Sequence, residues 1–141
     1  MMKDDWEKLI WNGNSNRKES EKKFEELLLR RDGLEAWNNW RSENSAEFLD
    51  FGEKYLPEAD FSGANLSGVG LWESILRGAD FDGANLSRAN FSRSDLGGAS
   101  FCEANLSQAN FSEAFFTEMT NFSEANLSEA NFSKSNLRAD L

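Results

Sequence analysis

The sequence of 141 residues contains no histidine, one cysteine and one proline. Without histidine there is no imidazole to act as the base of a Ser-His or Cys-His pair or as a metal ligand. A single cysteine forms neither an internal disulfide nor a thiolate metal cage, which is typical of a reducing compartment. No apolar run approaches the roughly 20 residues of a membrane span, and the N-terminus lacks the apolar core of a signal peptide. We therefore expect a cytoplasmic protein with no membrane contact, no metal and no cofactor.

The chain is also short of positive charge. It has 25 acidic and 15 basic residues, which gives a formal net charge of −10. An acidic surface repels nucleic acid phosphates, so we expect no direct nucleic-acid binding. The length indicates one domain, or one domain with an appendage. The one excess is phenylalanine, with 12 residues against a single tyrosine.

From residue 59 onward the sequence divides into units of five. Sixteen units run from ADFSG to SNLRA over residues 59–139, with one extra residue between AFFTE and TNFSE. The residue two positions before the middle of each unit is always small. The middle residues are Phe61, Leu66, Leu71, Leu76, Phe81, Leu86, Phe91, Leu96, Phe101, Leu106, Phe111, Phe116, Phe122, Leu127, Phe132 and Leu137.

A period of five fits neither a straight helix nor a flat strand. On a helix, every fifth residue is rotated by about 140°, and on a strand an odd period alternates between the two faces. A chain that turns a corner every five residues places every Leu and Phe inside. Four units per turn also align like residues in columns, such as Phe61, Phe81, Phe101 and Phe122. The pattern predicts a mainly β, four-sided solenoid of about four 20-residue coils.

These units resemble the consensus A(D/N)Lxx of the pentapeptide-repeat family. The resemblance covers well over half of the chain and implies a right-handed quadrilateral β-helix. The six-residue step from Phe116 to Phe122 departs from the consensus. We expect a small bulge at 117–121 there, with Met119 covering the corner.

The first 57 residues have a different composition. We expect a helical N-terminal region over residues 1–57, followed by the repeat domain over 58–141. Apolar spacing predicts helices at 5–11, 19–31 and 34–44, a polar linker at 12–20, and a further apolar segment at 45–56. The segment WNNWR resembles one found upstream of the repeats in bacterial, notably cyanobacterial, members of the family. Its Trp37 and Trp40 either cap the open end of the tube or form a recognition surface.

The outward positions are mostly polar, and the exceptions are of most interest. We number the four faces by the columns of middle residues that begin at Phe61, Leu66, Leu71 and Leu76. On the third face, Glu73, Arg93, Glu113 and Lys134 form a column of alternating charge. On the fourth face, Ile75 and Phe115 occupy outward positions where the consensus has Asp or Asn, and Trp72 is a further outward apolar residue on the neighbouring face. Clustered exposed apolar groups mark partner sites. Trp72, Ile75 and Phe115 are therefore a candidate partner surface, unless the N-terminal helices or the bulge cover them.

No residue pattern indicates catalysis. Cys102 has no base near it in the sequence, and Asp80 and Asp82 lie outward on a convex wall. We expect no enzymatic activity but a scaffold or regulatory protein that binds another protein, with a weak homodimer possible through the C-terminal coil.

The resemblance offers one alternative function. Some family members resemble a DNA duplex and modulate DNA gyrase. Four coils make a rod of about 15–19 Å, along which duplex DNA carries about ten charges. Residues 59–141 hold 11 acidic and five basic residues, with signs interleaved. This weak charge makes the DNA-mimic interpretation the less favoured one.

Overall fold

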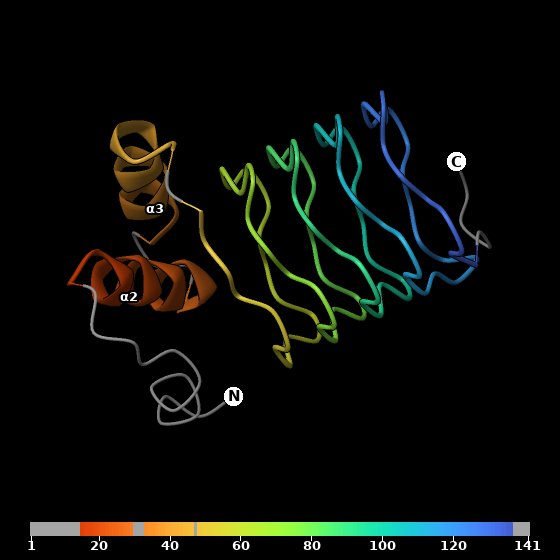
Figure 1. The fold of residues 1–141 in the computed structure, drawn as a ribbon, viewed down its shortest axis with the longest axis horizontal. Coiled ribbons are helices and arrows are strands. Elements are labelled where there is room, and N and C mark those ends of the chain that lie inside the picture. The colour runs from red at the N-terminus through yellow and green to blue at the C-terminus, as the bar shows by residue number, and fades with distance from the viewer. Residues whose placement is uncertain (1–14, 30–32, 47, 137–141) are drawn as a thin grey trace.

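The computed structural model describes residues 15–29, 33–46 and 48–136, in which two helices precede a stack of coils (Figure 1). With the labels of Figure 1, helix α2 spans Ser15–Leu29 and helix α3 spans Gly33–Glu43. Helix α3 matches the helix predicted at 34–44, whereas α2 takes up part of the predicted linker. The helix expected at 5–11 lies outside the described residues. Neither described helix has the length and apolar character needed to cross a bilayer.

Parallel bridges join residues of successive coils. Asn65 pairs with Asn85, and every bridge before the bulge likewise joins residues 20 apart. After the extra residue the spacing becomes 21, as between Ser100 and Asn121. Each bridge is a single pair, and four of them occur in every turn. The four-sided solenoid predicted from the period is therefore present.

The ladder begins earlier than the sequence boundary at residue 58. Asp50 pairs with Gly70 and Tyr55 with Ile75, so residues 49–56 form half of an additional coil rather than a helix. Phe51 and Leu56 are the buried middle residues of two irregular units, LDFGE and KYLPE. These units escape the sequence pattern because the small position is occupied by Leu49 in one and by Lys54 in the other.

Each side of the coil ends in a tight turn. Ala64 N–H donates to the Phe61 carbonyl at 3.0 Å, and φ is positive two residues after the middle residue, as at Gly63 (69°) and Glu103 (58°). A positive φ at the third residue is the geometry of a type II turn. For a residue other than glycine it costs about 1–2 kcal/mol.

The Asp or Asn of the repeat stabilises this turn. Asn85 Oδ1 accepts hydrogen bonds from Ser87 N–H at 3.2 Å and from Ser87 Oγ at 2.9 Å. Such Asx bonds hold the backbone locally in the turn. Comparable bonds to the N–H two residues on are accepted by Asp50, Asp60, Asn65, Asp80, Asn90, Asp95, Asn105, Asn110, Asn121, Asn126 and Asn131.

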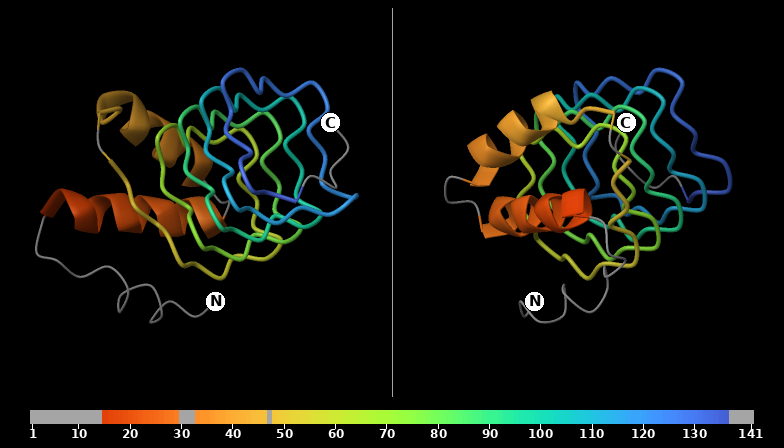
Figure 2. Two further views of the ribbon diagram at one scale, coloured as in Figure 1. Left: turned by 45° about the vertical axis from the view of Figure 1, so that its right-hand side comes forward. Right: turned by 60° about the vertical axis from the view of Figure 1, so that its left-hand side comes forward.

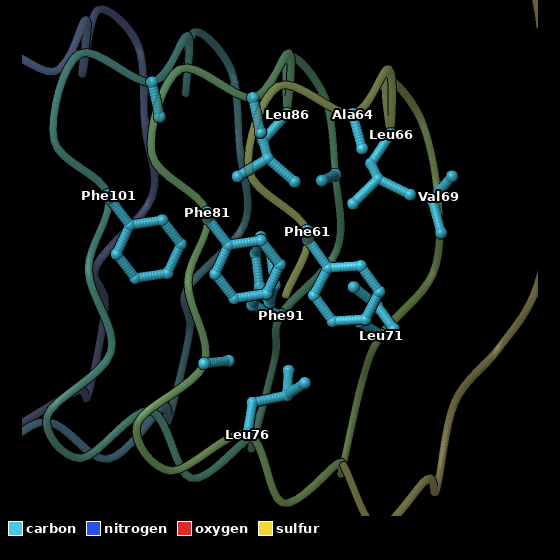
Figure 3. Packing of buried hydrophobic residues seen from close by; sticks show 14 of the residues in the cluster. Phe61, Ala64, Leu66, Val69, Leu71, Leu76, Phe81, Leu86, Phe91 and Phe101 are labelled. Carbon is cyan, nitrogen blue, oxygen red and sulfur yellow. The ribbon is translucent and has the colours of Figure 1, made fainter. Parts of the chain in front are cut away.

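Stacked phenylalanine rings fill the tube. Phe61, Phe81, Phe101 and Phe122 lie 4.9–5.1 Å apart in nearly parallel planes, and Figure 3 shows the first three in a row. The neighbouring column meets them edge-on, with Phe91 5.8 Å from Phe101 at 84°. Both arrangements are favoured for aromatic pairs. The phenylalanine excess is thus the filling of the core.

The bulge differs from the expectation in one respect. Met119 is 78% exposed and does not cover the corner, whereas Thr120 is fully buried. In the regular units, the turn residue with positive φ donates its N–H to a carbonyl of the next coil, as Gly78 N–H does to the Gly97 carbonyl at 2.9 Å. At the bulge this bond is replaced by hydroxyl groups. Thr120 Oγ1 accepts from the N–H of Gly98 and donates to the carbonyl of Leu96.

The Thr120 hydroxyl therefore has a measurable structural role. We expect Thr120→Val, which keeps the shape of the side chain, to lower the free energy of unfolding by about 1–3 kcal/mol because buried polar groups lose their partner. Chemical denaturation measures this change. Thr117→Val is the control, since the Thr117 hydroxyl bonds only to Gly98 among the described residues and its side chain is half-buried. Equal losses in the two variants would contradict the assignment.

Candidate functional site

The two helices lie at the N-terminal end of the coils in both views of Figure 2. Asn65 and Ser67 begin the second face, and in the described part of the chain no earlier coil pairs with their backbone. Trp37 Nε1 donates to the Asn65 carbonyl, and Arg41 Nη2 donates to the Ser67 carbonyl, both at 2.7 Å. Asn38 Oδ1 accepts from Asn65 N–H at 2.8 Å. Side chains of the WNNWR segment thus replace the backbone of a missing coil and satisfy an exposed sheet edge.

Aromatic rings complete this cap. Phe24 of α2 stacks on Phe51 at 4.1 Å and on Phe61 at 5.7 Å, which continues the phenylalanine column into the helices. Trp37 is fully buried and Trp40 is 7% exposed. Of the two roles considered for these tryptophans, their burial and bonding favour the cap.

The charged column of the third face is neutralised locally. Arg93 Nη1 lies 3.2 Å from Glu73 Oε1, and Arg93 Nε lies 3.5 Å from Glu113 Oε2. The hydrogen bond that Arg93 donates to Glu73, with the charge of Glu113, raises the pKa of Arg93 above its usual value. The alternating signs seen in the sequence therefore correspond to paired charges at Glu73, Arg93 and Glu113.

The first face does not form a reactive site. Partial burial, followed by the charge of Asp82, raises the pKa of the Cys102 thiol, so the thiol stays protonated near neutral pH. Asp82 instead accepts hydrogen bonds from Cys102 N–H and Ser100 Oγ. In the described part of the chain, no three Asp, Glu, Cys or His side chains come together as a metal site requires.

The fourth face carries the strongest departure from the repeat. Tyr55, Ile75, Asp95 and Phe115 occupy one column, each bridged to the next. Tyr55 is 64% exposed, Ile75 36% and Phe115 46%. We call Tyr55, Ile75 and Phe115 the fourth-face stripe. Asp95, which interrupts it, is paired with Arg77 at 2.8 Å.

Tyr55 was not predicted from the sequence as part of this surface, whereas Trp72 was predicted there and is found packed against the first half-coil. Tyr55 lay in the region expected to be helical, although it precedes Leu56 as Ile75 precedes Leu76. The half-buried Trp72 donates from Nε1 to Asp50 Oδ1 at 2.7 Å. Its ring covers Gly52, where an added Cβ would come within 2.1 Å of it. In the structure, Ile75 and Phe115 therefore share a column with Tyr55, whereas the Trp72 ring packs against Gly52 of the first half-coil.

The stripe residues depart from the rule that stabilises the turns. At the same position, Asp and Asn side chains elsewhere accept the Asx bond, for which the stripe residues have no oxygen in place. After Tyr55 no such bond is available because Pro57 has no N–H, and after Phe115 the Thr117 N–H donates to Thr120 Oγ1 at 3.1 Å instead. Of the three, Ile75 therefore lacks a bond of about 0.5–1.5 kcal/mol, and all three positions keep an apolar side chain partly in water. Positions that break a local rule without structural compensation are expected at functional sites.

Both the repeat and the fold are found in known proteins. A family model described as pentapeptide repeats matches residues 55–83, 84–118 and 119–139. The chain is similar to HetL, a pentapeptide repeat protein involved in heterocyst differentiation regulation from the cyanobacterium Nostoc sp. strain PCC 7120. Identity is 32% and the TM-score 0.53, over 64% of this chain and 48% of HetL. The chain thus spans about half the length of HetL.

Two further solved structures are similar. A pentapeptide repeat protein from the Arabidopsis thaliana thylakoid lumen is 31% identical, with a TM-score of 0.49 over 65% of this chain and 61% of its own. QnrB1, a plasmid-mediated fluoroquinolone resistance protein, is 23% identical, with a TM-score of 0.38 over 67% of this chain and 65% of its own. A search of curated proteins finds no match.

Proposed function

The chain belongs to the pentapeptide-repeat family, whose members fold as right-handed quadrilateral β-helices, and we propose that it is a non-enzymatic interaction protein that binds another protein through the fourth-face stripe. The observation that carries the proposal is the alignment of three exposed apolar side chains at positions that in most other units hold Asp or Asn. A regulatory role is one form that such binding takes, and HetL is involved in regulation of heterocyst differentiation.

The charges support a protein partner over a DNA-like role. The gyrase-directed alternative needs a dense, uncompensated negative field along the rod. Arg93 is instead paired with Glu73 and Glu113, and Arg77 with Asp95. The acidic surface is therefore partly neutralised within the protein.

The weak homodimer through the C-terminal coil is a separate proposal. Its support is the partial exposure of the middle residues Leu127 and Phe132 in the last described coil, whereas the middle residues of the earlier coils are buried.

Replacing the stripe with the consensus residue separates stability from binding. We expect Ile75→Asn/Phe115→Asn to unfold with a free energy equal to or up to about 1 kcal/mol above that of the wild type, because the Asn introduced at position 75 accepts the turn bond that Ile75 cannot accept. The same variant should lose its partner. Chemical denaturation measures the first effect. Affinity capture from a lysate of the source organism, with captured proteins identified and quantified, measures the second.

The reverse exchange on the third face is the matched control. Asn90 and Asn110 occupy the equivalent column there, and Asn110 Nδ2 donates to Asn90 Oδ1 at 3.2 Å. Asn90→Ile/Asn110→Ile should destabilise the protein and leave capture unchanged. The proposal fails if the stripe variant captures the same proteins in the same amounts as the wild type.

A further inference from the structure

We infer that the occupant of the fourth-face stripe is a basic amphipathic α-helix of the partner protein, an inference that rests on the proposed function. Three features of the face lead to it: the backbone is paired between successive coils, the apolar side chains are spaced along the solenoid axis, and the bordering corners carry negative charge.

Between its successive coils, the backbone of this face offers nothing to a partner strand. Ile75 N–H donates to the Lys54 carbonyl, and the Ile75 carbonyl accepts from Leu56 N–H, both at 2.8 Å. Asp95 N–H donates to the Ser74 carbonyl at 2.9 Å. A β-strand binds by adding to a free edge, so strand addition has no place along the stripe, where the coils are already paired. A partner must bind through side chains.

The spacing of the stripe suits a helix that lies along the solenoid axis. Successive coils are about 4.8 Å apart, so Tyr55 and Ile75 are separated by one such step and Ile75 and Phe115 by two. A helix presents apolar residues at i, i+3 or i+4, and i+7, one turn of about 5.4 Å apart. Three helical turns therefore cover the stripe. The Asp95–Arg77 pair in the middle presents opposite charges that offset each other.

The border of the stripe favours a basic partner. The corner before the fourth face carries Glu53, Glu73 and Glu113, and the corner after it carries Glu58 and Glu118, all exposed. Two basic residues share the first corner: Arg93, which is held between Glu73 and Glu113, and the exposed Lys134, so five glutamates against two basic residues leave the border negative. Complementary charge at the rim directs association and selects partners. Lysine or arginine beside an apolar helix face meets this requirement.

Three labelled model helices of 18 residues test the inference. The first has leucine at helical spacing and lysine elsewhere, the second replaces each lysine with glutamate, and the third replaces each leucine with serine. Fluorescence anisotropy at physiological ionic strength gives their affinities for the full chain. We expect the leucine–lysine peptide to bind at least about tenfold more tightly than either of the others, a difference of about 1.4 kcal/mol.

Variants locate the binding. Ile75→Asn/Phe115→Asn should weaken the leucine–lysine peptide about tenfold. Glu58→Gln/Glu118→Gln should weaken it and reduce the dependence of affinity on salt. Glu103→Gln/Glu124→Gln removes the same charge from exposed positions on the first face and should leave the affinity near that of the wild type.

Specific results overturn the inference. It fails if the acidic peptide binds as tightly as the basic one, or if the two glutamine pairs have equal effects. It also fails if the stripe instead mediates self-association, shown by a dimer that the Ile75→Asn/Phe115→Asn variant abolishes. If the wild type captures a protein that the stripe variant does not, and no model peptide binds, the helix is rejected and the proposed function is kept. If neither stripe-dependent capture nor peptide binding is observed, the helix and the proposed function are both rejected.

Discussion

Replacing Trp37 with alanine should lower the free energy of unfolding by about 3–5 kcal/mol, the range for a large aromatic residue removed from a core. The ring is fully buried and lies 5.7 Å from Phe24 and 5.8 Å from Trp40 between ring centres. The substitution also removes the donor to the Asn65 carbonyl, which leaves an edge group without its partner. Chemical denaturation followed by circular dichroism measures the loss.

Two further measurements separate packing from edge protection. Trp37→Phe keeps most of the packing but removes the indole N–H, so its loss should be smaller than that of the alanine variant. Both variants expose the edge at Asn65, and exposed edges promote association between chains. Sedimentation should therefore show larger species for both variants than for the wild type. A Trp37→Ala protein as stable and as monodisperse as the wild type would falsify the capping role.

The repeat could be predicted from the sequence because its cause is local. A small residue, in most units an Asp or Asn, and a Leu or Phe recur every five residues, and most units form the same turn with the same Asx bond. Since these interactions lie within one unit or between adjacent coils, period and column order were enough to place Phe61, Phe81 and Phe101 in one stack. Helix α3 followed from apolar spacing for the same reason.

The parts that the sequence did not reveal depend on contacts distant in the chain. Lys54 occupies a position that is small in every regular unit, so the first half-coil was assigned to the helical region and Tyr55 was missed with it. Met119 was placed over the corner because it is apolar. The group that the bulge requires is a hydroxyl that replaces a lost backbone bond, and Thr120 supplies it. No spacing rule indicates which ladder bond an insertion breaks.

The same difference between local and distant contacts applies to the candidate surface. Ile75 and Phe115 could be singled out because each breaks the consensus within its own unit. Their alignment with Tyr55 depends on pairing across coils, which only the register of the ladder reveals. A cap was one of the two roles expected for the WNNWR segment, but the bonds from Trp37 and Arg41 to Asn65 and Ser67 depend on which edge meets α3.

Phe101→Ala should be as damaging as loss of the cap, with a cost of about 3–5 kcal/mol. Phe101 is fully buried and stacks on Phe81 at 4.9 Å and on Phe122 at 5.0 Å. Stability in a solenoid is the sum of unit terms and nearest-neighbour terms, so a cavity in a central coil weakens the interfaces on both sides.

Graded substitutions test this expectation by chemical denaturation. Phe101→Leu restores a residue type found at other middle positions and should cost less than about 1.5 kcal/mol. Phe132→Ala, in the last described coil, should cost less than Phe101→Ala because Phe132 is only partly buried and stacks on Phe111 alone. If Phe132→Ala proved as costly as Phe101→Ala, the stability of the solenoid could not depend on contacts with two neighbouring coils.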